Sequence, residues 1–237
     1  AVYKQRCASC HEGSLPRMPT RQALGAMSPE HIESELASFS MRRQGAALSP
    51  AERRAVAEFL TGRPAGSYRS PIAVIPKSAY CSTTGATAGD VLNGASWNGW
   101  GIDLQNSRHQ PADAAGLTAA DVPRLKLKWS FGFAGASASG SQVSIVGNRV
   151  FVGSRNGVMY SLDRQTGCLV WAFEADAGTR STPVVMRSTG GSGATVYFGD
   201  AHAQVYALDA GTGALKWKVK VEDHLDAMIT GGVVFHN

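Results

Sequence analysis

Three residues near the start of the chain have the types and spacing that attach a haem. Cys7, Cys10 and His11 form the sequence CASCH, a Cys-x-x-Cys-His pattern. In such a pattern the two thiols add across the vinyl groups of a haem, and the imidazole that follows them binds the iron. A helical turn brings both sulfur atoms to one edge of the porphyrin and the imidazole beneath it. The spacing therefore predicts a covalent haem c with His11 as one axial ligand.

Two other uses of a Cys-x-x-Cys pair fit the surrounding sequence less well. A thioredoxin-like redox pair requires a strand–helix–strand pattern around the cysteines, and the sequence lacks one. A zinc site requires two more ligands at suitable spacing, and none is convincing here. Haem attachment is therefore the interpretation that we adopt for this motif.

A methionine is expected as the second axial ligand, because a thioether raises the reduction potential of an electron-carrying haem. Met41 lies between two predicted helices, where small cytochromes c present this ligand. Met18 follows His11 closely, and Met27 directly precedes a helix cap. We expect Met41 to bind the iron and keep Met18 as the alternative. Packing against the haem edge is the simpler role for Met18 and Met27.

Short helices are predicted around this motif, over residues 2–10, 28–39 and 49–60. The second and third begin with the same Ser-Pro-x-Glu sequence, in which the serine caps the helix and the proline enters its first turn. Gly62 and Pro64 end the third helix. This order of helices around a haem resembles that of class I cytochromes c. We therefore expect a small all-α class I cytochrome c domain over residues 1–64.

The composition excludes some classes of function and favours an all-β second part. Glycine accounts for 27 of the 237 residues, above its usual share of about 7%, which favours tight turns between short strands. The net charge of +5 comes from 23 basic and 18 acidic residues without a basic stripe, so we expect no nucleic-acid partner. No apolar run approaches the roughly 18 residues of a membrane span, so none is expected.

A repeat with a period of 46 residues lies beyond residue 90. The sequence Y-x-L-D-x-x-T-G-x-L-x-W occurs at 160–171 and 206–217, and a weaker copy ends at Trp129. Strands are predicted at 150–154, 157–163, 168–174 and 181–186, with tight turns between them. Four strands in about 45 residues make one blade of a β-propeller. Residues 91–237 are thus expected to form about three blades, and the Pro-rich and small polar residues 65–90 a linker.

The repeat is similar to that of propellers that bind pyrroloquinoline quinone (PQQ), in which the repeated tryptophan docks against the neighbouring blade. More distinctive segments lie at 97–111 (WNGWGIDLQNSRHQP) and 115–129 (AGLTAADVPRLKLKW). Together with residues 149–168 they resemble the polyvinyl alcohol dehydrogenase family, quinohaemoproteins in which a cytochrome c domain precedes a PQQ propeller. The resemblance implies oxidation of secondary alcohols, including polymeric ones, to ketones.

Further expectations follow from the same resemblance. Electrons would pass from PQQ to haem c and on to an external acceptor such as a soluble cytochrome c. Calcium would lie beside the quinone, and the protein would be periplasmic or secreted. Two other functions fit the same features. One is a non-enzymatic electron-transfer cytochrome c tethered to a propeller that binds other proteins, and the other is a quinoprotein acting on another alcohol or a sugar.

Two residues are candidate PQQ ligands. PQQ carries carboxylates, for which a bidentate arginine is the natural partner. Arg180 enters the last predicted strand of its repeat, and Gln142 takes a similar place one repeat earlier. His224 and Asp226 precede the next such strand, where an exposed loop is their simpler role.

Residues 1–237 are too few for a complete propeller. Eight blades of about 45 residues each require several hundred residues. The catalytic base, the metal ligands and most PQQ ligands are therefore expected beyond Asn237 in a longer protein, and the fragment alone is expected to be inactive.

Cys81 and Cys168 are the cysteines outside the haem motif. A covalent haem implies an oxidising compartment, in which these two cysteines can form a disulfide. Two buried free thiols are also compatible with the sequence, because spacing alone does not establish the geometry of a bond.

Overall fold

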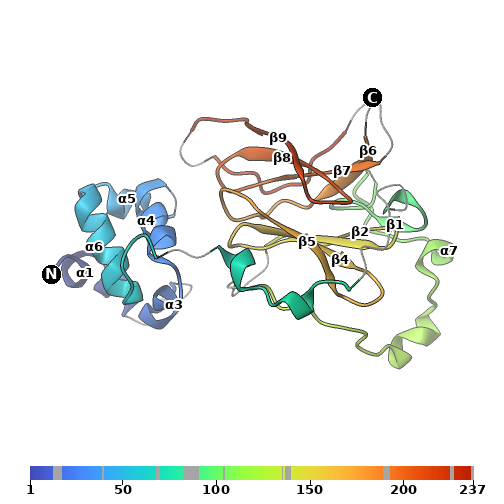
Figure 1. Cartoon of the computed structure of the whole chain (residues 1–237), viewed down its shortest axis with the longest axis horizontal. Helices are drawn as coiled ribbons and strands as arrows, with labels where there is room; N and C mark the ends of the chain where they lie inside the picture. Colours follow the sequence, from blue (N-terminus) through green and yellow to red (C-terminus); the bar gives the residue numbers. More distant parts are fainter. Residues whose placement is uncertain are drawn as a thin grey trace. The chain divides into compact units, whose positions relative to one another are not determined.

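The computed structural model describes residues 1–12, 18–38, 40–67, 70–82, 91–103, 105–134, 136, 140–188, 193–224 and 227–235. The chain divides into two compact units, Ala1–Arg69 and Ser70–Asn237. Figure 1 shows helices in the first unit and strands in the second. No helix in the described ranges has the length and apolarity needed to cross a membrane.

The first unit is all-α. Its helices are α1 (Val2–Arg6), α2 (Ala8–His11), α3 (Arg21–Gly25), α4 (Pro29–Ser38), α5 (Arg42–Gly45) and α6 (Pro50–Thr61). The predicted helices correspond to α1 with α2, to α4 and to α6. Phe39, expected at the end of the second predicted helix, lies outside the described residues. Helices α3 and α5 were not predicted, because four or five residues are too few for an apolar period to show.

Local hydrogen bonds explain where the longer helices begin. At the start of α4, Ser28 Oγ accepts a hydrogen bond from His31 N at 3.0 Å. At the start of α6, Ser49 Oγ accepts from Glu52 N at 3.2 Å, and Glu52 Oε2 accepts from Ser49 N at 2.8 Å. This reciprocal pair is a capping box. Helix α6 ends at Gly62, whose φ of 65° favours a residue without a Cβ.

One apolar cluster joins the helices of the first unit. Its buried members come from α1, α3, α4 and α6: Tyr3, Leu24, Ile32, Leu36, Val56 and Ala57. Tyr3 and Phe59 pack ring to ring at 5.4 Å between centroids, so the first and last helices of the unit are in contact. The guanidinium of Arg21 lies 4.9 Å from the centre of the Phe59 ring, and Phe59 is 49% exposed.

The second unit is built on two antiparallel sheets. Sheet 1 has the order β1-β2-β3-β4-β5 and sheet 2 the order β6-β7-β8-β9. The strands are β1 (Ser96–Trp97), β2 (Ser144–Val146), β3 (Arg149–Gly153), β4 (Val158–Asp163), β5 (Leu169–Glu174), β6 (Val184–Arg187), β7 (Ala194–Gly199), β8 (Gln204–Asp209) and β9 (Leu215–Lys220). Short helical turns lie outside the sheets: η1 (Pro71–Val74), η2 (Lys77–Ala79), α7 (Ala112–Ala115) and η4 (Ala119–Arg124).

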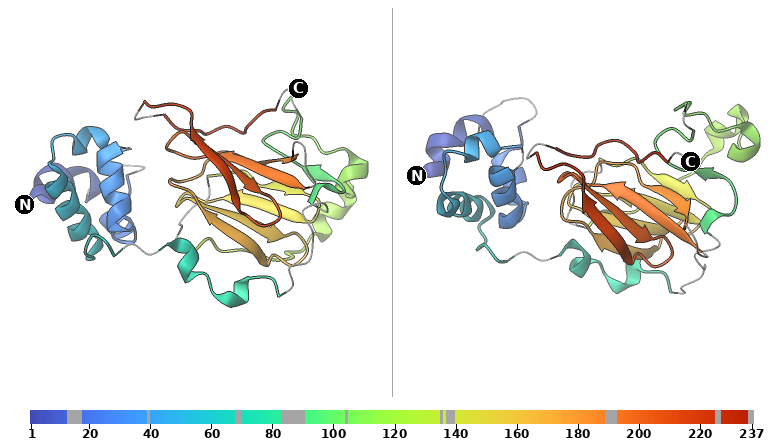
Figure 2. Two further views of the ribbon diagram at one scale, coloured as in Figure 1. Left: turned by 45° about the horizontal axis from the view of Figure 1, so that its top comes forward. Right: turned by 90° about the horizontal axis from the view of Figure 1, so that it is seen from above.

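The two sheets pack face to face, as both views in Figure 2 show. The hydrophobic cluster between them combines side chains of both sheets, among them Phe151, Met159, Trp171, Val196, Phe198 and Leu208. A second cluster lies on the other face of sheet 1 and includes Val152, Tyr160 and Leu169. Both faces of sheet 1 are therefore buried, as expected of a blade inside a stack.

The structure confirms antiparallel sheets of the propeller type. It differs from the expectation in the number of sheets and in the sheet to which one predicted strand belongs. The described residues form two sheets where about three blades are predicted, because residues 105–134 contain no strand and only α7 and η4. The strand predicted at 181–186 is β6, which pairs with β7 of the following repeat. The connection over residues 175–183 is too long for a tight hairpin, so the chain passes to the next sheet there.

Candidate functional site

The predicted haem-attachment residues lie on α2 and its cap. Cys7 is the N-cap of α2, and His11 lies in its last turn. His11 N donates to Cys7 O at 3.1 Å, so the two residues share one helical turn. Cys7 is half-buried, Cys10 is exposed and His11 is 6% exposed. Burial, followed by the neighbouring Cys10, raises the pKa of the Cys7 thiol.

A single hydrogen bond orients the His11 ring. His11 Nδ1 lies 2.8 Å from Pro19 O. Because a carbonyl oxygen only accepts, Nδ1 carries a proton, and a metal would be bound through Nε2. A histidine that binds a metal through one ring nitrogen commonly donates from the other in this way. Sequence reasoning missed Pro19, since a backbone carbonyl has no sequence signal.

The three candidate methionines differ in their surroundings. Met27 and Met41 are partly buried and pack against the apolar cluster of the first unit, as Cys7 does. Met18 is 45% exposed. Met41 is also the N-cap of α5, and its backbone N–H donates to Glu35 O at 3.2 Å. This environment favours Met41 or Met27 over Met18, and the assignment of Met41 to the iron stays a prediction.

In the second unit, two arginines lie together at the end of sheet 1 where β3 turns into β4. We call this end the arginine end. Arg155 lies in that turn and Arg180 in the connection from β5 to β6, and both are exposed. A Cβ added to Gly140 would lie 3.2 Å from Arg180 Cγ and 3.5 Å from Arg155 Cγ. The missing side chain at Gly140 thus lets the two arginines flank one position.

Sequence reasoning identified Arg180 but missed Arg155. Arg155 lies in a turn of the repeat, and its counterpart one period later is Ala201. No repeated pattern therefore marks position 155. Its proximity to Arg180 depends on the packing of two connections that are 25 residues apart in sequence.

Gln142 lies at the same end but is engaged differently. Its side-chain amide donates from Nε2 to Trp100 O at 2.9 Å. The strand registers make Ser144 equivalent to Val184, because each pairs with the same position of the next repeat strand. Counting back, Gln142 corresponds to Thr182, so it does not take the place of Arg180 as expected. The role of Gln142 toward PQQ stays a prediction.

Residues 98–103 and 105–111 of the distinctive segment form a loop that contacts Gln142. Asp103 Oδ1 accepts from Ser107 N at 2.8 Å, and hydrogen bonds from the Ser107 side chain and backbone hold the pKa of Asp103 below its usual value. The Arg108 guanidinium lies 5.2 Å from the centre of the half-exposed Trp100 ring. Three non-glycine residues of this loop have positive φ: Ile102, Asn106 and Arg108. Such strain occurs where a loop is held by its surroundings.

The remaining sequence candidates in the second unit are His224 and Asp226. His224 is exposed after β9, and Asp226 lies outside the described residues. Across the ranges that the structure describes, no group of three or more His, Cys, Asp or Glu side chains could hold a metal ion. Calcium also takes amide and backbone carbonyl oxygens as ligands, and the calcium site that the family resemblance implies stays a prediction.

Cys81 and Cys168 are joined by a disulfide, with 5.0 Å between their Cα atoms. This resolves the two alternatives left by the sequence. The bond lies at the end of sheet 1 opposite the arginine end, because Cys168 directly precedes β5. A shallow pocket beside it is lined by Ser82, Arg149, Asp163, Thr166 and Val170 as well as by the two cysteines.

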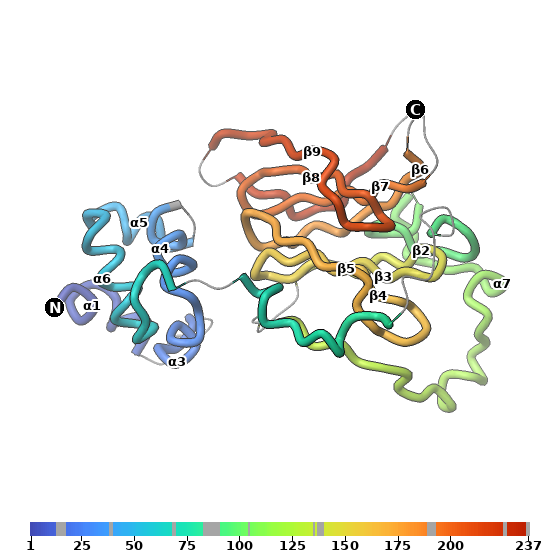
Figure 3. Tube along the Cα trace, in the orientation of Figure 1, coloured from blue at the N-terminus to red at the C-terminus, as the bar shows by residue number. Residues whose placement is uncertain are grey.

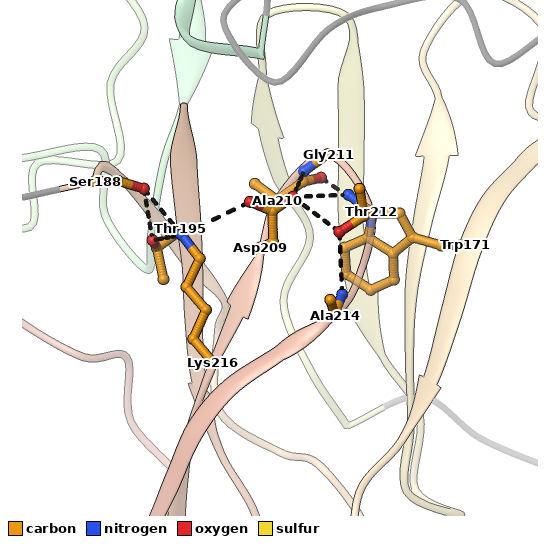
Figure 4. Close-up of polar contacts among 9 residues, drawn as sticks. All are labelled: Trp171, Ser188, Thr195, Asp209, Ala210, Gly211, Thr212, Ala214 and Lys216. Carbon is orange, nitrogen blue, oxygen red and sulfur yellow. Dashed lines mark hydrogen bonds and ion pairs between the residues drawn. The ribbon is translucent and has the colours of Figure 1, made fainter. Parts of the chain in front are cut away.

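The repeated tryptophan connects one sheet to the next. Trp171 of β5 donates from Nε1 to Ala210 O at 3.0 Å, and its ring lies against Gly213. Figure 4 shows the turn beneath the ring, in which Asp209 Oδ1 accepts from Thr212 N at 2.9 Å. Lys216 Nζ lies 3.7 Å from Asp209 Oδ2. The tryptophan and the Asp-x-x-Thr-Gly turn are therefore structural.

The same contact occurs one repeat earlier. Trp129 Nε1 donates to Arg164 O at 3.0 Å, and a Cβ on Gly167 would lie 2.5 Å from the Trp129 ring. The segment between β1 and β2 thus docks on sheet 1 through the same tryptophan–glycine contact by which sheet 1 docks on sheet 2. The recurrence of this contact is typical of propeller repeats.

A family model described as outer membrane protein assembly factor BamB matches residues 113–225. Together with the 46-residue repeat of the chain and the two packed sheets, this match defines the second unit as part of a PQQ-type β-propeller. Over its whole length the chain is 37% identical to a polyvinylalcohol dehydrogenase of Pseudomonas sp, and it spans 38% of that protein. The chain is 30% identical, over 78% of its length, to a polyvinylalcohol dehydrogenase of Sphingopyxis sp. (strain 113P3), of which it spans 29%. By sequence, the chain is thus a homologue of polyvinylalcohol dehydrogenases over its whole length, which confirms the resemblance seen in residues 97–129 and 149–168.

Solved structures also align with the chain. Quinohemoprotein alcohol dehydrogenase from Comamonas testosteroni is 20% identical, with a TM-score of 0.48, and the alignment covers 69% of this chain and 25% of that chain. A europium-containing methanol dehydrogenase is 24% identical, with a TM-score of 0.46, and the alignment covers 60% of this chain and 26% of that chain.

Proposed function

We propose that the protein is a quinohaemoprotein dehydrogenase that oxidises secondary alcohols, including polyvinyl alcohol-like polymers, to ketones. The observation that carries this proposal is the buried and oriented His11, next to Cys7 and Cys10, in a chain homologous to polyvinylalcohol dehydrogenases. Electrons from the alcohol would leave through haem c in the first unit to an external acceptor such as a soluble cytochrome c.

The residues of the first unit fit a covalent haem. Cys7 and Cys10 would form the thioether bonds, and His11 would bind the iron through Nε2 while Pro19 O keeps the proton on Nδ1. Met41 would bind the opposite side of the iron. A half-buried Cys7 and a buried His11 beside an apolar cluster suit a large, mostly apolar group.

The residues at the arginine end fit a ligand with carboxylates. The aliphatic stems of Arg155 and Arg180 both lie close to Gly140, so the two side chains start from neighbouring positions. Each guanidinium could donate two parallel hydrogen bonds to a carboxylate of PQQ. When bound, PQQ supplies acceptance of the two electrons of alcohol oxidation, and haem supplies one-electron transfer. No residue of this chain is assigned as the catalytic base, and no step is assigned to calcium.

The cysteine chemistry supports a periplasmic or secreted location. A disulfide such as Cys81–Cys168 is typical of proteins exported to an oxidising compartment, and the proposed thioether-linked haem fits the same location. An acceptor that takes single electrons in that compartment is then expected to be a soluble protein.

Haem attachment and alcohol-driven haem reduction test the proposal in sequence. The chain is expressed with the cytochrome c maturation machinery and examined for haem that stays attached after denaturation. Cys7→Ala with Cys10→Ala is expected to lose it. The full-length protein, reconstituted with PQQ and calcium, is then mixed with a secondary alcohol, which is expected to reduce the haem.

The outcomes separate three functions. A colourless chain after correct maturation contradicts the proposal altogether. Bound haem that no alcohol reduces favours an electron carrier tethered to a protein-binding propeller, for which the match to the BamB family model is the supporting observation. Reduction by sugars or primary alcohols alone favours a quinoprotein with a different substrate.

A further inference from the structure

Residues 70–82 run along the outer edge of sheet 1, beside β5, and we call them the strap. Figure 3 shows the strap as a green-blue trace next to that sheet. At its beginning, Ser70 Oγ donates to Glu174 Oε2 at the end of β5. At its end, Tyr80 pairs with Leu169, and Cys81 N donates to Leu169 O at 2.9 Å. The strap therefore spans β5 from one end to the other.

The strap is packed as well as hydrogen-bonded. Ile72, Ile75 and Tyr80 pack against the apolar cluster on the outer face of sheet 1, and Pro71 is buried. In strand β9, the counterpart of β5 in sheet 2, all six residues are exposed in the described part of the chain. The strap thus covers apolar side chains beside β5 and pairs with the backbone of this outer strand at Leu169.

The disulfide holds one end of the strap covalently. Cys81 and Cys168 are 87 residues apart in sequence, so their bond closes a long loop. Closing a long loop strongly restricts the open states of a chain. Without the bond, the strap would be held at this end by the Cys81 N–H contact and by apolar packing alone.

The two ends of the strap lie at different ends of sheet 1. Glu174, the partner of Ser70, pairs with Val158, which directly follows the turn that contains Arg155. The strap therefore begins at the arginine end, and the disulfide lies at the opposite end. Residue 70 is also the first residue of the second unit, and the first unit ends directly before it.

We propose that the strap is a latched positioning element. The Cys81–Cys168 bond keeps residues 70–82 on β5 and so fixes, at the arginine end, the point from which the first unit is tethered. Its consequence for electron transfer rests on the proposed function, because it assumes a haem in the first unit and a quinone near the arginines. Release of the strap would add about twelve residues to the tether, which extend over up to roughly 40 Å.

Hydrogen exchange tests the latch without either cofactor. The double variant Cys81→Ser, Cys168→Ser is compared with the wild-type chain by mass spectrometry. Amides of residues 71–81 are expected to exchange at least about tenfold faster in the variant, because loss of a long-range cross-link favours local opening. Amides of β7 and β8 are expected to be unaffected. Unchanged exchange in the strap would overturn the latch.

Two comparisons make the exchange result specific. Val196→Ala removes a buried side chain of sheet 2 and is expected to leave strap exchange unchanged, so a general loss of stability is distinguishable from release of the latch. If the double serine variant does not fold, the disulfide of the folded wild-type chain is reduced with a phosphine, which leaves thioether bonds intact. The same rise in exchange is expected, and its absence counts against the latch.

Rapid mixing of the full-length, PQQ-loaded protein with alcohol tests the positioning role. The variant is expected to reduce its haem about fivefold or more slowly, since a longer tether lowers the effective concentration of one unit at the other. Alcohol oxidation with a small artificial acceptor is expected to be unchanged. Equal haem reduction in both proteins would overturn the positioning role. If alcohol reduces the haem of neither the variant nor the wild-type protein, the proposed function fails and the positioning role fails with it. The hydrogen-exchange experiment still tests whether the disulfide holds the strap on β5.

Discussion

The imidazole of His11 shows how one backbone oxygen can determine the chemistry of a side chain. Pro19 lies in a separate segment from α2, yet its carbonyl oxygen fixes which ring nitrogen carries the proton. His11 is only 6% exposed, and burying its polar ring without a hydrogen-bond partner would be unfavourable. Arg155 and Arg180 show the opposite case. Both side chains are exposed and charged, and it is their shared position beside Gly140 that makes them candidate ligands for a carboxylate.

At the residue scale we predict that Arg180→Ala weakens PQQ binding to the apo protein about tenfold or more. The reason is the loss of a charge-assisted hydrogen bond, typically worth about 1.5–3 kcal/mol. Isothermal titration of the full-length apo protein with PQQ measures the change. Arg187→Ala is the matched control, because Arg187 is an exposed arginine at the other end of β6. Equal affinities for the Arg180 variant and the wild type would remove Arg180 from the site.

At the element scale, helices and sheets are joined by small, repeated contacts. The capping box of Ser49 and Glu52 sets the first turn of α6. The tryptophan of β5 joins sheet 1 to sheet 2 through one hydrogen bond and one glycine. Each contact satisfies backbone groups that would otherwise lack a partner at the end of an element.

We predict that the first unit loses the stabilisation from its capping box as the pH falls. Backbone and side-chain hydrogen bonds from Ser49 hold the pKa of Glu52 below its usual value. Because the folded pKa is the lower one, the stabilisation is complete above the unfolded pKa and is lost as the pH falls through the folded pKa. Chemical denaturation of residues 1–69 between pH 3 and 7 is expected to show a shallower acid limb for Glu52→Gln.

A double-mutant cycle controls for this effect. In the Ser49→Ala background, Glu52 no longer receives these hydrogen bonds, so Glu52→Gln is expected to have little further effect on the acid limb. An undiminished effect in that background would mean that the pH dependence has another origin.

The contact between the sheets gives a second prediction at the element scale. Trp171→Phe leaves Ala210 O without its donor and removes part of a buried ring, so the second unit is expected to lose about 1–3 kcal/mol of unfolding free energy. Trp217→Phe is the matched control at the equivalent position of β9, where the ring is 45% exposed. Its expected loss in this chain is below about 0.5 kcal/mol. Equal losses in urea denaturation would show that the docking contact adds no stability.

At the scale of the whole molecule, two units with separate cores lie in one chain. The apolar cluster of residues 1–69 and the clusters of residues 70–237 share no member. Units with independent cores unfold independently unless a large interface couples them. The only covalent cross-link among the described residues, Cys81–Cys168, lies within the second unit.

We therefore predict two calorimetric transitions that respond to different substitutions. Val56→Ala in α6 and Val196→Ala in β7 each remove two buried methyl groups and are expected to cost about 2 kcal/mol, but in different transitions. Each variant thus serves as the control for the other. A shift of both transitions by either variant would show that the units unfold as one.

The sequence by itself determined what depends on near neighbours. The Cys-x-x-Cys-His spacing, the serine caps, the Asp-x-x-Thr-Gly turns and the repeat period all involve residues within a few positions or one period of each other. Local hydrogen bonds and strand alternation encode such features directly.

Only the tertiary structure decided which distant segments meet. It brought Pro19 O to His11, Arg155 to Arg180, Cys81 to Cys168 and β6 to β7 of the following sheet. These contacts were missed, left open or assigned to the wrong sheet, because one local pattern is compatible with many pairings of distant segments. The choice among them is made by the burial of both faces of a sheet and by the length of the connections, which act only once the chain is folded.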